Sequence, residues 1–167
     1  MCSIELWLRY LAFLLKCAAR LVSPVKISEL EPLGRALFSG HVKIKTSGPK
    51  ISPNAFMINS KSESGISVNR TSHAPLRLFS ILGQKSAAKR SVNFYGFASF
   101  SGGSPSRVKL EDGFKLSPRG VPTILNPVHA DISLPPDRKK DYYMFIATEM
   151  VKYCKFVSPE QESVAGT

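Results

Sequence analysis

Apolar and polar residues alternate along one short segment in the C-terminal third of the chain. Between residues 128 and 134 every second residue is apolar. Successive side chains of a strand point to opposite faces of its sheet, so this pattern predicts a strand with one buried face. The expected buried face consists of Val128, Ala130, Ile132 and Leu134, and the expected polar face consists of His129, Asp131 and Ser133.

Other segments have weaker strand patterns. Residues 51–58 and 65–70 are short runs between Gly, Ser and Pro residues, and we expect both to be extended. Residues 91–103 (SVNFYGFASFSGG) are rich in β-forming residues and end in a glycine pair, which predicts a strand followed by a turn. Residues 107–116 predict a hairpin with the Asp-Gly pair at its turn.

Two segments carry apolar residues at helical spacing. The first covers residues 74–90, where Pro75 suits the start of a helix. The second covers residues 137–157, with Asp137 as the expected N-cap. Short strands interspersed with helices are typical of the α+β class. We therefore expect a small mixed sheet of short strands with two or three helices, together with an amphipathic helix at the N-terminal end.

That N-terminal helix is expected over residues 4–22 (IELWLRYLAFLLKCAARLV). Its cations Arg9, Lys16 and Arg20 fall on one narrow stripe, within about 40° of each other at helical spacing. Three cations inside the apolar run disfavour a membrane span and a cleaved signal. Two alternatives stay open: peripheral contact with a membrane surface, and docking on a partner, on a second copy or on the domain itself.

The chain is expected to divide into three parts. Residues 25–158 form a single basic α+β domain, preceded by the amphipathic segment 1–24 and followed by a flexible tail, 159–167. The 3 Cys form no CxxC pair, and the 3 His are scattered, so we expect no metal and no cofactor. Reduced thiols indicate a cytoplasmic protein, with a location at the membrane periphery as the alternative.

Positive charge is concentrated in one part of the sequence. Between residues 32 and 110 there are 12 Lys or Arg and one acidic residue, whereas the rest of the chain has 11 of each sign. A one-sided field attracts polyanions, although a solvated basic face is the plainer interpretation. We expect a nucleic-acid partner, RNA or single strands rather than duplex, because no helix-turn-helix or zinc finger is evident. The expected contacts are Lys43, Lys45, Arg70, Arg77, Lys85, Lys89 and Arg90.

Three short motifs, SPNAF at 52–56, GISVNR at 65–70 and NPVHADI at 126–132, follow one another along the chain. Their spacing resembles that in a family of small bacterial hypothetical proteins, over about residues 33–134. The family implies no established activity. The resemblance ranks Arg70, Asn126, Pro127 and His129 as positions of interest, and it implies that the first 25 or so residues are an extension or an upstream start.

Histidines supply the candidate chemistry. His129 and Asp131 share a strand face, so the carboxylate could orient the imidazole, or both could belong to a solvent-facing polar row. Arg70 and His73 precede the helix expected from residue 74, where a phosphate can bind free backbone N–H groups. An alternative function is therefore a small metal-independent nuclease or toxin, in which one histidine removes the 2′-OH proton and the other protonates the leaving oxygen. His73 is equally compatible with an ordinary role near the helix start.

Overall fold

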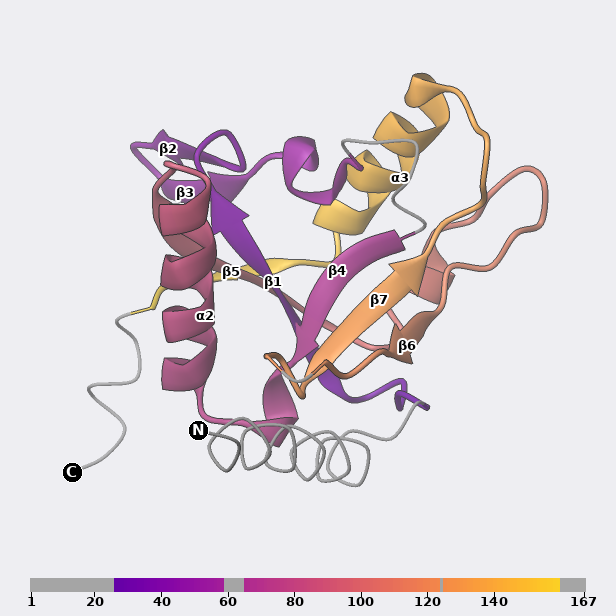
Figure 1. The fold of residues 1–167 in the computed structure, drawn as a ribbon. Coiled ribbons are helices and arrows are strands. Elements are labelled where there is room, and N and C mark those ends of the chain that lie inside the picture. Colours follow the sequence, from indigo (N-terminus) through magenta and orange to yellow (C-terminus); the bar gives the residue numbers. More distant parts are fainter. Residues whose placement is uncertain (1–25, 59–64, 124, 160–167) are drawn as a thin grey trace, which may run out of the picture.

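The structure is a computed structural model that describes residues 26–58, 65–123 and 125–159. Within these residues six strands form one sheet in the order β6-β7-β4-β1-β5-β8 (Figure 1). The strands are β1 (Pro32–Phe38), β4 (Gly65–Arg70), β5 (Phe94–Ser101), β6 (Pro118–Gly120), β7 (His129–Ser133) and β8 (Lys155–Val157). A separate hairpin joins β2 (Val42–Lys45) to β3 (Gly48–Ile51).

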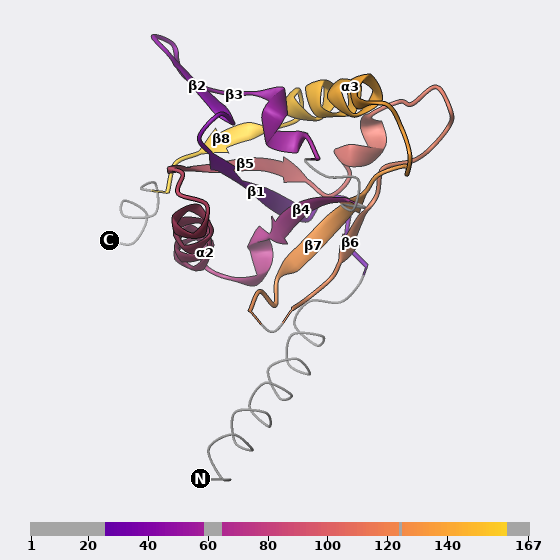
Figure 2. The same ribbon diagram turned by 45° about the horizontal axis from the view of Figure 1, so that its top comes forward.

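Two α-helices among the described residues cover the opposite faces of the sheet. Helix α2 (Leu76–Lys89) packs on one face, and α3 (Lys140–Val151) packs on the other (Figure 2). The short 3-10 helix η1 (Pro53–Phe56) lies against α3, η2 (Thr71–His73) leads from β4 into α2, and η3 (Pro105–Arg107) follows β5. The sheet is therefore the middle of three layers.

Side-chain alternation along the strands divides the core between the two faces. On β4, Ile66 and Val68 are buried beside Ala130 and Ile132 of β7, in the core that α3 covers. A smaller cluster, formed by Phe79, Phe97 and Val128, lies under α2. Each face of the sheet is thus covered by one helix, and the polar positions of β4 and β7 lie on the α2 side.

The α+β class predicted from the sequence is confirmed, but the mixed sheet is not. All strand pairs among the described residues are antiparallel. Antiparallel neighbouring strands need no crossover helix between them, so short turns and loops are enough to connect them. The strands expected over 65–70, 91–103 and 128–134 are confirmed, with the alternation of exposed and buried positions in β7 as predicted.

Val128 was predicted to share one buried face with Ala130 and Ile132, and this part of the prediction is wrong. It is buried, but it packs with Phe79 and Phe97 under α2 instead of joining Ala130 and Ile132. The reason is that β7 begins only at His129, after a turn in which the His129 N–H donates to the Asn126 carbonyl at 3.2 Å. Alternation holds inside a strand and not in the turn that precedes it.

Two segments expected to be strands take other conformations. Within 51–58, the residues after Ile51 form η1, because the Ser52 side chain accepts a hydrogen bond from the Asn54 N–H and Pro53 occupies the first helical turn. The hairpin expected over 107–116 has its turn but no strands: the Phe114 N–H donates to Asp112 Oδ1 at 3.0 Å. The apolar residues beside this turn are buried in the core instead of pairing with each other.

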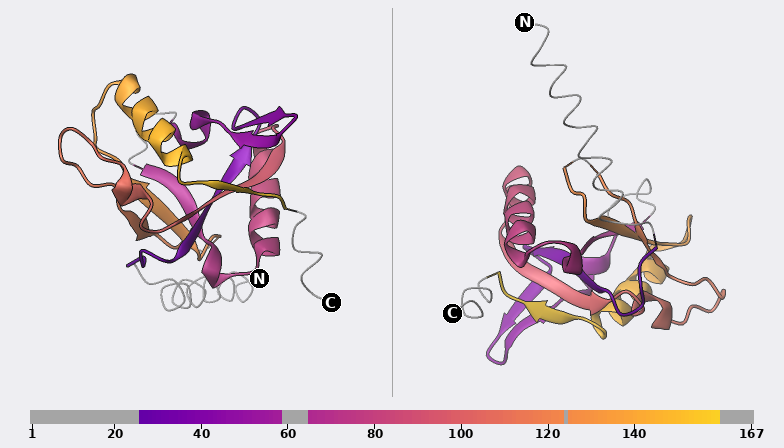
Figure 3. Two further views of the ribbon diagram at one scale, coloured as in Figure 1. Left: turned by 180° about the vertical axis from the view of Figure 1, so that it is seen from behind. Right: turned by 90° about the horizontal axis from the view of Figure 1, so that it is seen from below.

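The helix expected over residues 137–157 is shorter at both ends. Asp137 has a φ of 53°, which an N-cap residue does not adopt, and the N-cap is Lys139. The helix ends at Val151, and the chain then continues as β8, which pairs with β5 and forms one edge of the sheet (Figure 3). The helix expected over 74–90 is confirmed as α2.

The amphipathic helix expected over 4–22 and the end of the flexible tail, 160–167, lie outside the described residues. Membrane contact, docking and self-association through residues 4–22 therefore stay predictions. Among the described residues, no helix has the length and the apolar character needed to cross a membrane.

Candidate functional site: a polar cleft beside helix α2

A cleft of about 430 Å³ lies on the α2 side of the sheet. Its walls come from α2, β1, β4, one residue of β7 and the segments around His41, Met57 and Asn126. The residues that line it are Arg35, Ala36, Phe38, His41, Met57, Gly65, Ser67, Asn69, Leu82, Gly83, Ser86, Arg90, Asn126 and Asp131. This volume is within the range of about 300 to 1,000 Å³ that is typical of small-ligand sites.

The cleft exists because β1 and β4 pair at one end only. Their register partners in the described chain are Leu33 with Arg70 and Gly34 with Asn69. Past this point Arg35 bridges the gap: its Nη1 donates to the Ser67 carbonyl at 2.6 Å, and its Nε donates to the Ala55 carbonyl. The guanidinium thus replaces strand-to-strand hydrogen bonds and becomes part of the cleft wall.

Helix α2 forms the opposite wall and is held close to β5. A Cβ atom at Gly83 would lie 2.4 Å from the Phe94 ring, so only glycine permits this approach. One turn earlier, the Phe79 ring meets Phe97 edge to face, with centroids 6.4 Å apart. The helix is therefore fixed by its packing on two rings of β5, and the residues of its last turns face the cleft.

Cations gather at the end of the cleft next to the β2–β3 hairpin. The Arg90 guanidinium lies over the Phe38 ring, 5.2 Å from its centroid, and the His41 ring lies 5.8 Å from the same ring. Burial, and then the charges of Arg35 and Arg90, lower the pKa of His41 from 6.5 to about 4. The Phe38 N–H donates to His41 Nδ1 at 3.2 Å, so this histidine is neutral at pH 7 and carries its proton on Nε2.

Hydrogen-bond acceptors gather at the other end of the cleft. Asn126 Nδ2 donates to Asn69 Oδ1 at 2.7 Å. Asn126 Oδ1 is buried and has no hydrogen-bond partner among the described residues. The backbone around it is fixed, because the Asn126 N–H donates to Thr123 Oγ1 and the Asn126 carbonyl accepts from the His129 N–H. The turn before β7 therefore places an acceptor at the cleft.

Between these ends Ser67 and Asp131 line the cleft, and His129, which is not part of the lining, contacts both of them. His129 Nε2 is 3.3 Å from Asp131 Oδ1, and His129 Nδ1 is 3.4 Å from Ser67 Oγ. The contact arises from register, because Ser67 of β4 stands directly opposite Asp131 of β7. The side chain of His129 is 19% exposed and that of Asp131 is 37% exposed, so both reach solvent. Their expected place on one polar face is confirmed, whereas their role stays a prediction.

Arg70 and His73 belong to a different cluster. Arg70 is 2% exposed and forms a two-point ion pair with Glu31, in which Nη2 donates to Oε2 at 2.7 Å. His73 Nε2 lies 3.4 Å from the same carboxylate. Burial raises the pKa of Glu31, but the hydrogen bond and charge of Arg70, with the charge of His73, outweigh it and lower the pKa overall. Arg70 therefore does not present its donors to a phosphate at the surface.

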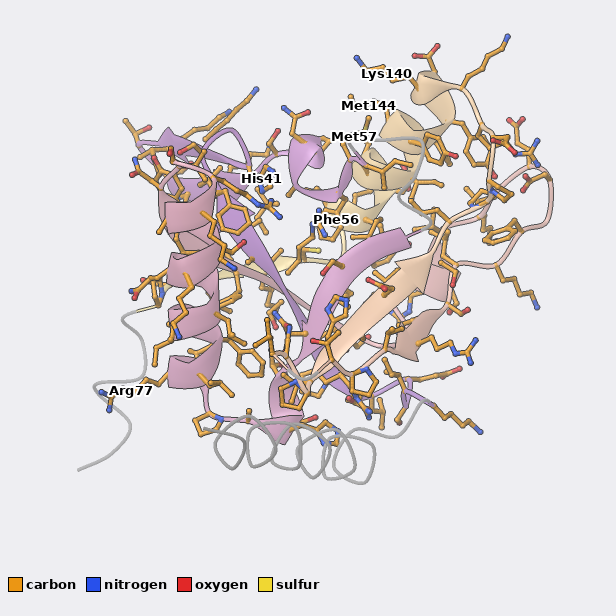
Figure 4. The ribbon with its side chains drawn as sticks, in the orientation of Figure 1. His41, Phe56, Met57, Arg77, Lys140 and Met144 are labelled. Atoms are coloured by element: carbon orange, nitrogen blue, oxygen red, sulfur yellow. The ribbon has the colours of Figure 1, made fainter. Side chains whose placement is uncertain are left out.

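The expected nucleic-acid contacts do not all lie together. Lys43 and Lys45 are exposed on β2, and Lys85, Lys89 and Arg90 are exposed on the C-terminal half of α2. The base of the hairpin is tied to the end of α2, since the Ser39 N–H donates to the Asn93 carbonyl at 3.1 Å. Arg77 is exposed at the other end of the helix, far from His41 (Figure 4), and Arg70 is buried.

Sequence reasoning missed Arg35, His41, Ser67 and Asn69. A cation in the middle of the apolar run PLGRALF was a usable sign that Arg35 has a special role, because an arginine on a core strand needs partners. The other three carry no local signal: Ser67 and Asn69 come close to Arg35 only because distant strands pair, and His41 lies in the turn that follows β1.

Comparisons with protein-family models, with curated proteins and with solved structures found no match. The resemblance to small bacterial proteins stays untested. No group of three or more His, Cys, Asp or Glu among the described residues is arranged to hold a metal ion.

Proposed function

We propose that the protein binds nucleic acid, with single strands or RNA favoured over duplex, as a binding or accessory component. One observation carries the proposal: exposed cations of the hairpin and of the last turns of α2 lie at the same end of the molecule, at the mouth of a cleft. Between residues 32 and 110 the sequence has 12 Lys or Arg against a single acidic residue, Glu63, so this part of the chain is predominantly positive. Phosphates are attracted to such a one-signed surface.

The shape of this region favours a single strand. The cleft of about 430 Å³ has room for one small group and not for a double helix. Bases of a single strand can leave the stack and enter such a cleft while the phosphates contact the surrounding lysines. A duplex keeps its bases paired and would meet only the rim.

Salt dependence tests the proposal. Affinity for a short fluorescent single-stranded RNA should fall by orders of magnitude between about 50 and 200 mM salt, as counterions released from the RNA oppose binding. The triple variant Lys85→Gln, Lys89→Gln, Arg90→Gln should lower the slope of log affinity against log salt by about 2, because each contact to a single strand contributes about 0.7.

The matched control removes the same charge elsewhere. Lys139 and Lys140 are exposed at the start of α3, with Lys140 far from His41 (Figure 4), and Lys115 is exposed in the loop between η3 and β6. Their replacement by Gln should lower affinity less and leave the slope nearly unchanged. If both triple variants lower the affinity and the salt slope equally, binding depends on the net charge and not on this surface. If the wild type has no affinity for RNA at low salt, the proposal is wrong.

A second candidate function is RNA cleavage with His129 as the general base. The contact of His129 with Asp131 favours it, because a carboxylate on Nε2 can hold the ring proton there and leave Nδ1 to take a proton from a 2′-OH that displaces its contact with Ser67. The two-histidine mechanism expected from the sequence has less support, since Glu31 engages His73 in another cluster.

Cleavage of a labelled RNA, with a 2′-O-methyl RNA as the uncleavable control, tests this candidate. His129→Ala should abolish cleavage and Asp131→Asn should reduce it, whereas His73→Ala should leave most of it. His129→Ala should also change the free energy of unfolding little, because the side chain lies on the partly exposed face of β7. A wild-type protein that leaves the RNA intact would exclude the nuclease.

A further inference from the structure

We propose that the cleft beside α2 binds one nucleotide whose base carries an amino group, with its phosphate at the Arg90 end and its base at the Asn126 end. The proposal rests on the proposed function and deepens it, since it assigns a ligand to one defined part of the basic surface. It predicts a preference for adenine and cytosine over uracil.

The dimensions of the cleft suit one nucleotide. Its floor along β4 runs from Asn69 to Gly65, about 13 Å at the rise of an extended strand. The wall residue Ala36 is small, so the middle of the cleft is open on the β1 side, and Leu82 and Met57 supply apolar contacts. A cleft with mostly fixed walls and a few placed polar groups is typical of small-ligand sites.

The hairpin end of the cleft suits a phosphate. Arg90 is held over Phe38, which restricts the guanidinium and lowers the entropy lost when it binds an anion. Arg35 adds a second positive charge from the cleft wall, and His41 is kept neutral by its burial and by these two charges. A phosphate here would replace repulsion among cations by attraction.

The other end suits an amino group. Asn126 Oδ1 is a buried acceptor without a donor among the described residues. A buried polar atom without a hydrogen bond costs free energy, and a ligand that donates to it would remove this cost. The Asp131 carboxylate also lines the cleft and offers acceptor oxygens only. Adenine and cytosine present an exocyclic NH₂ to these acceptors, whereas the corresponding uracil oxygen would face them with a lone pair.

Mononucleotide titrations of the full chain, followed by NMR, test the proposal. AMP and CMP should bind at least fivefold more tightly than UMP, and the His41 ring and the amides around Asn126 should shift together. Adenosine without phosphate, and inorganic phosphate without a base, should each bind more weakly than AMP. Equal affinity for AMP and UMP would overturn the assignment of the base end.

Variants assign each end. Asn126→Ala should remove the preference for AMP over UMP while it retains phosphate-dependent binding, and Arg90→Gln should weaken AMP and UMP equally. If Asn126→Ala melts the protein, Asp131→Asn, in the middle of the cleft, provides the second test of the amino-group contact. Lys140→Gln, at the start of α3 on the opposite face of the sheet, should change neither affinity; a loss equal to that of Arg90→Gln would place binding outside the cleft.

The result separates this proposal from the broader one. If a short RNA binds with the salt slope described above but AMP does not bind, the nucleotide cleft is wrong and the basic surface stands. If neither binds at low salt, both are wrong.

Discussion

Removing the negative charge of Glu31 should destabilise the fold strongly. The carboxylate sits in a two-point ion pair with Arg70, whose side chain is 2% exposed, and its own side chain is 9% exposed. Glu31→Gln would leave the guanidinium in a nearly dry site with a neutral amide in place of its counterion. Breaking a buried pair by removing one partner costs about 3 to 5 kcal/mol, because the remaining charge is uncompensated.

Urea unfolding of the wild type and of Glu31→Gln measures this cost. We expect a drop of about 3 kcal/mol or more in the free energy of unfolding at pH 7. The double variant Glu31→Gln, Arg70→Met should recover part of the loss, since an apolar chain of similar length tolerates burial. A single-variant loss below about 1 kcal/mol, the value of an exposed pair, would refute the buried ion pair.

The same variants decide between a structural and a phosphate-binding role of Arg70. Arg70 donates hydrogen bonds to Glu31 and not to a surface ligand. Arg70→Met in the Glu31→Gln background should therefore leave the RNA affinity of the folded protein unchanged. If this double variant binds RNA as weakly as the triple variant of α2, then Arg70 contacts the ligand and its placement in the core is not its whole role.

Three further predictions concern pH and packing. Because the pKa of Glu31 is lowered in the folded state, its stabilisation is present above its ordinary value of 4.5 and should be lost as the pH falls through the folded value, which acid unfolding followed by circular dichroism measures. The pKa of His41 is lowered to about 4, so its ring signals in NMR spectra should not titrate between pH 8 and 5. The free energy of unfolding should decline as the pH falls from about 6.5 to 4, because the unfolded chain takes up this proton first. A titration midpoint near 6.5 would contradict the buried position of His41. Gly83→Ala should cost about 1 to 3 kcal/mol in urea unfolding, since the new Cβ would lie 2.4 Å from Phe94, and an unchanged midpoint would show that α2 does not pack this closely.

Local patterns predicted the parts of this fold that local forces determine. Alternation located β7 and placed His129 and Asp131 on one face, and helical spacing located α2. The end of the helix near Val151 could not be foreseen, because residues 155–157 pair with β5, more than fifty positions away in the chain. A helical pattern in that segment was outweighed by an available sheet edge.

Arg70 illustrates a signal that was present but misread. In GISVNR the arginine has the same parity as Ile66 and Val68, so alternation already placed it on the buried face. Its partner, Glu31, lies 39 positions earlier, just outside the basic segment, and a buried cation is identified as structural only when its counterion is known. The cleft likewise depends on how β1, β4 and α2 meet, which no single segment encodes.

Mapping the bound surface tests the central proposal most directly. Addition of a short single-stranded RNA to the ¹⁵N-labelled full chain at low salt should shift the amide signals of the β2–β3 hairpin, the last turns of α2 and the cleft around His41. The α3 helix, on the opposite face of the sheet, should remain unshifted. Shifts confined to α3, or spread evenly over the surface, would contradict binding at the basic cleft.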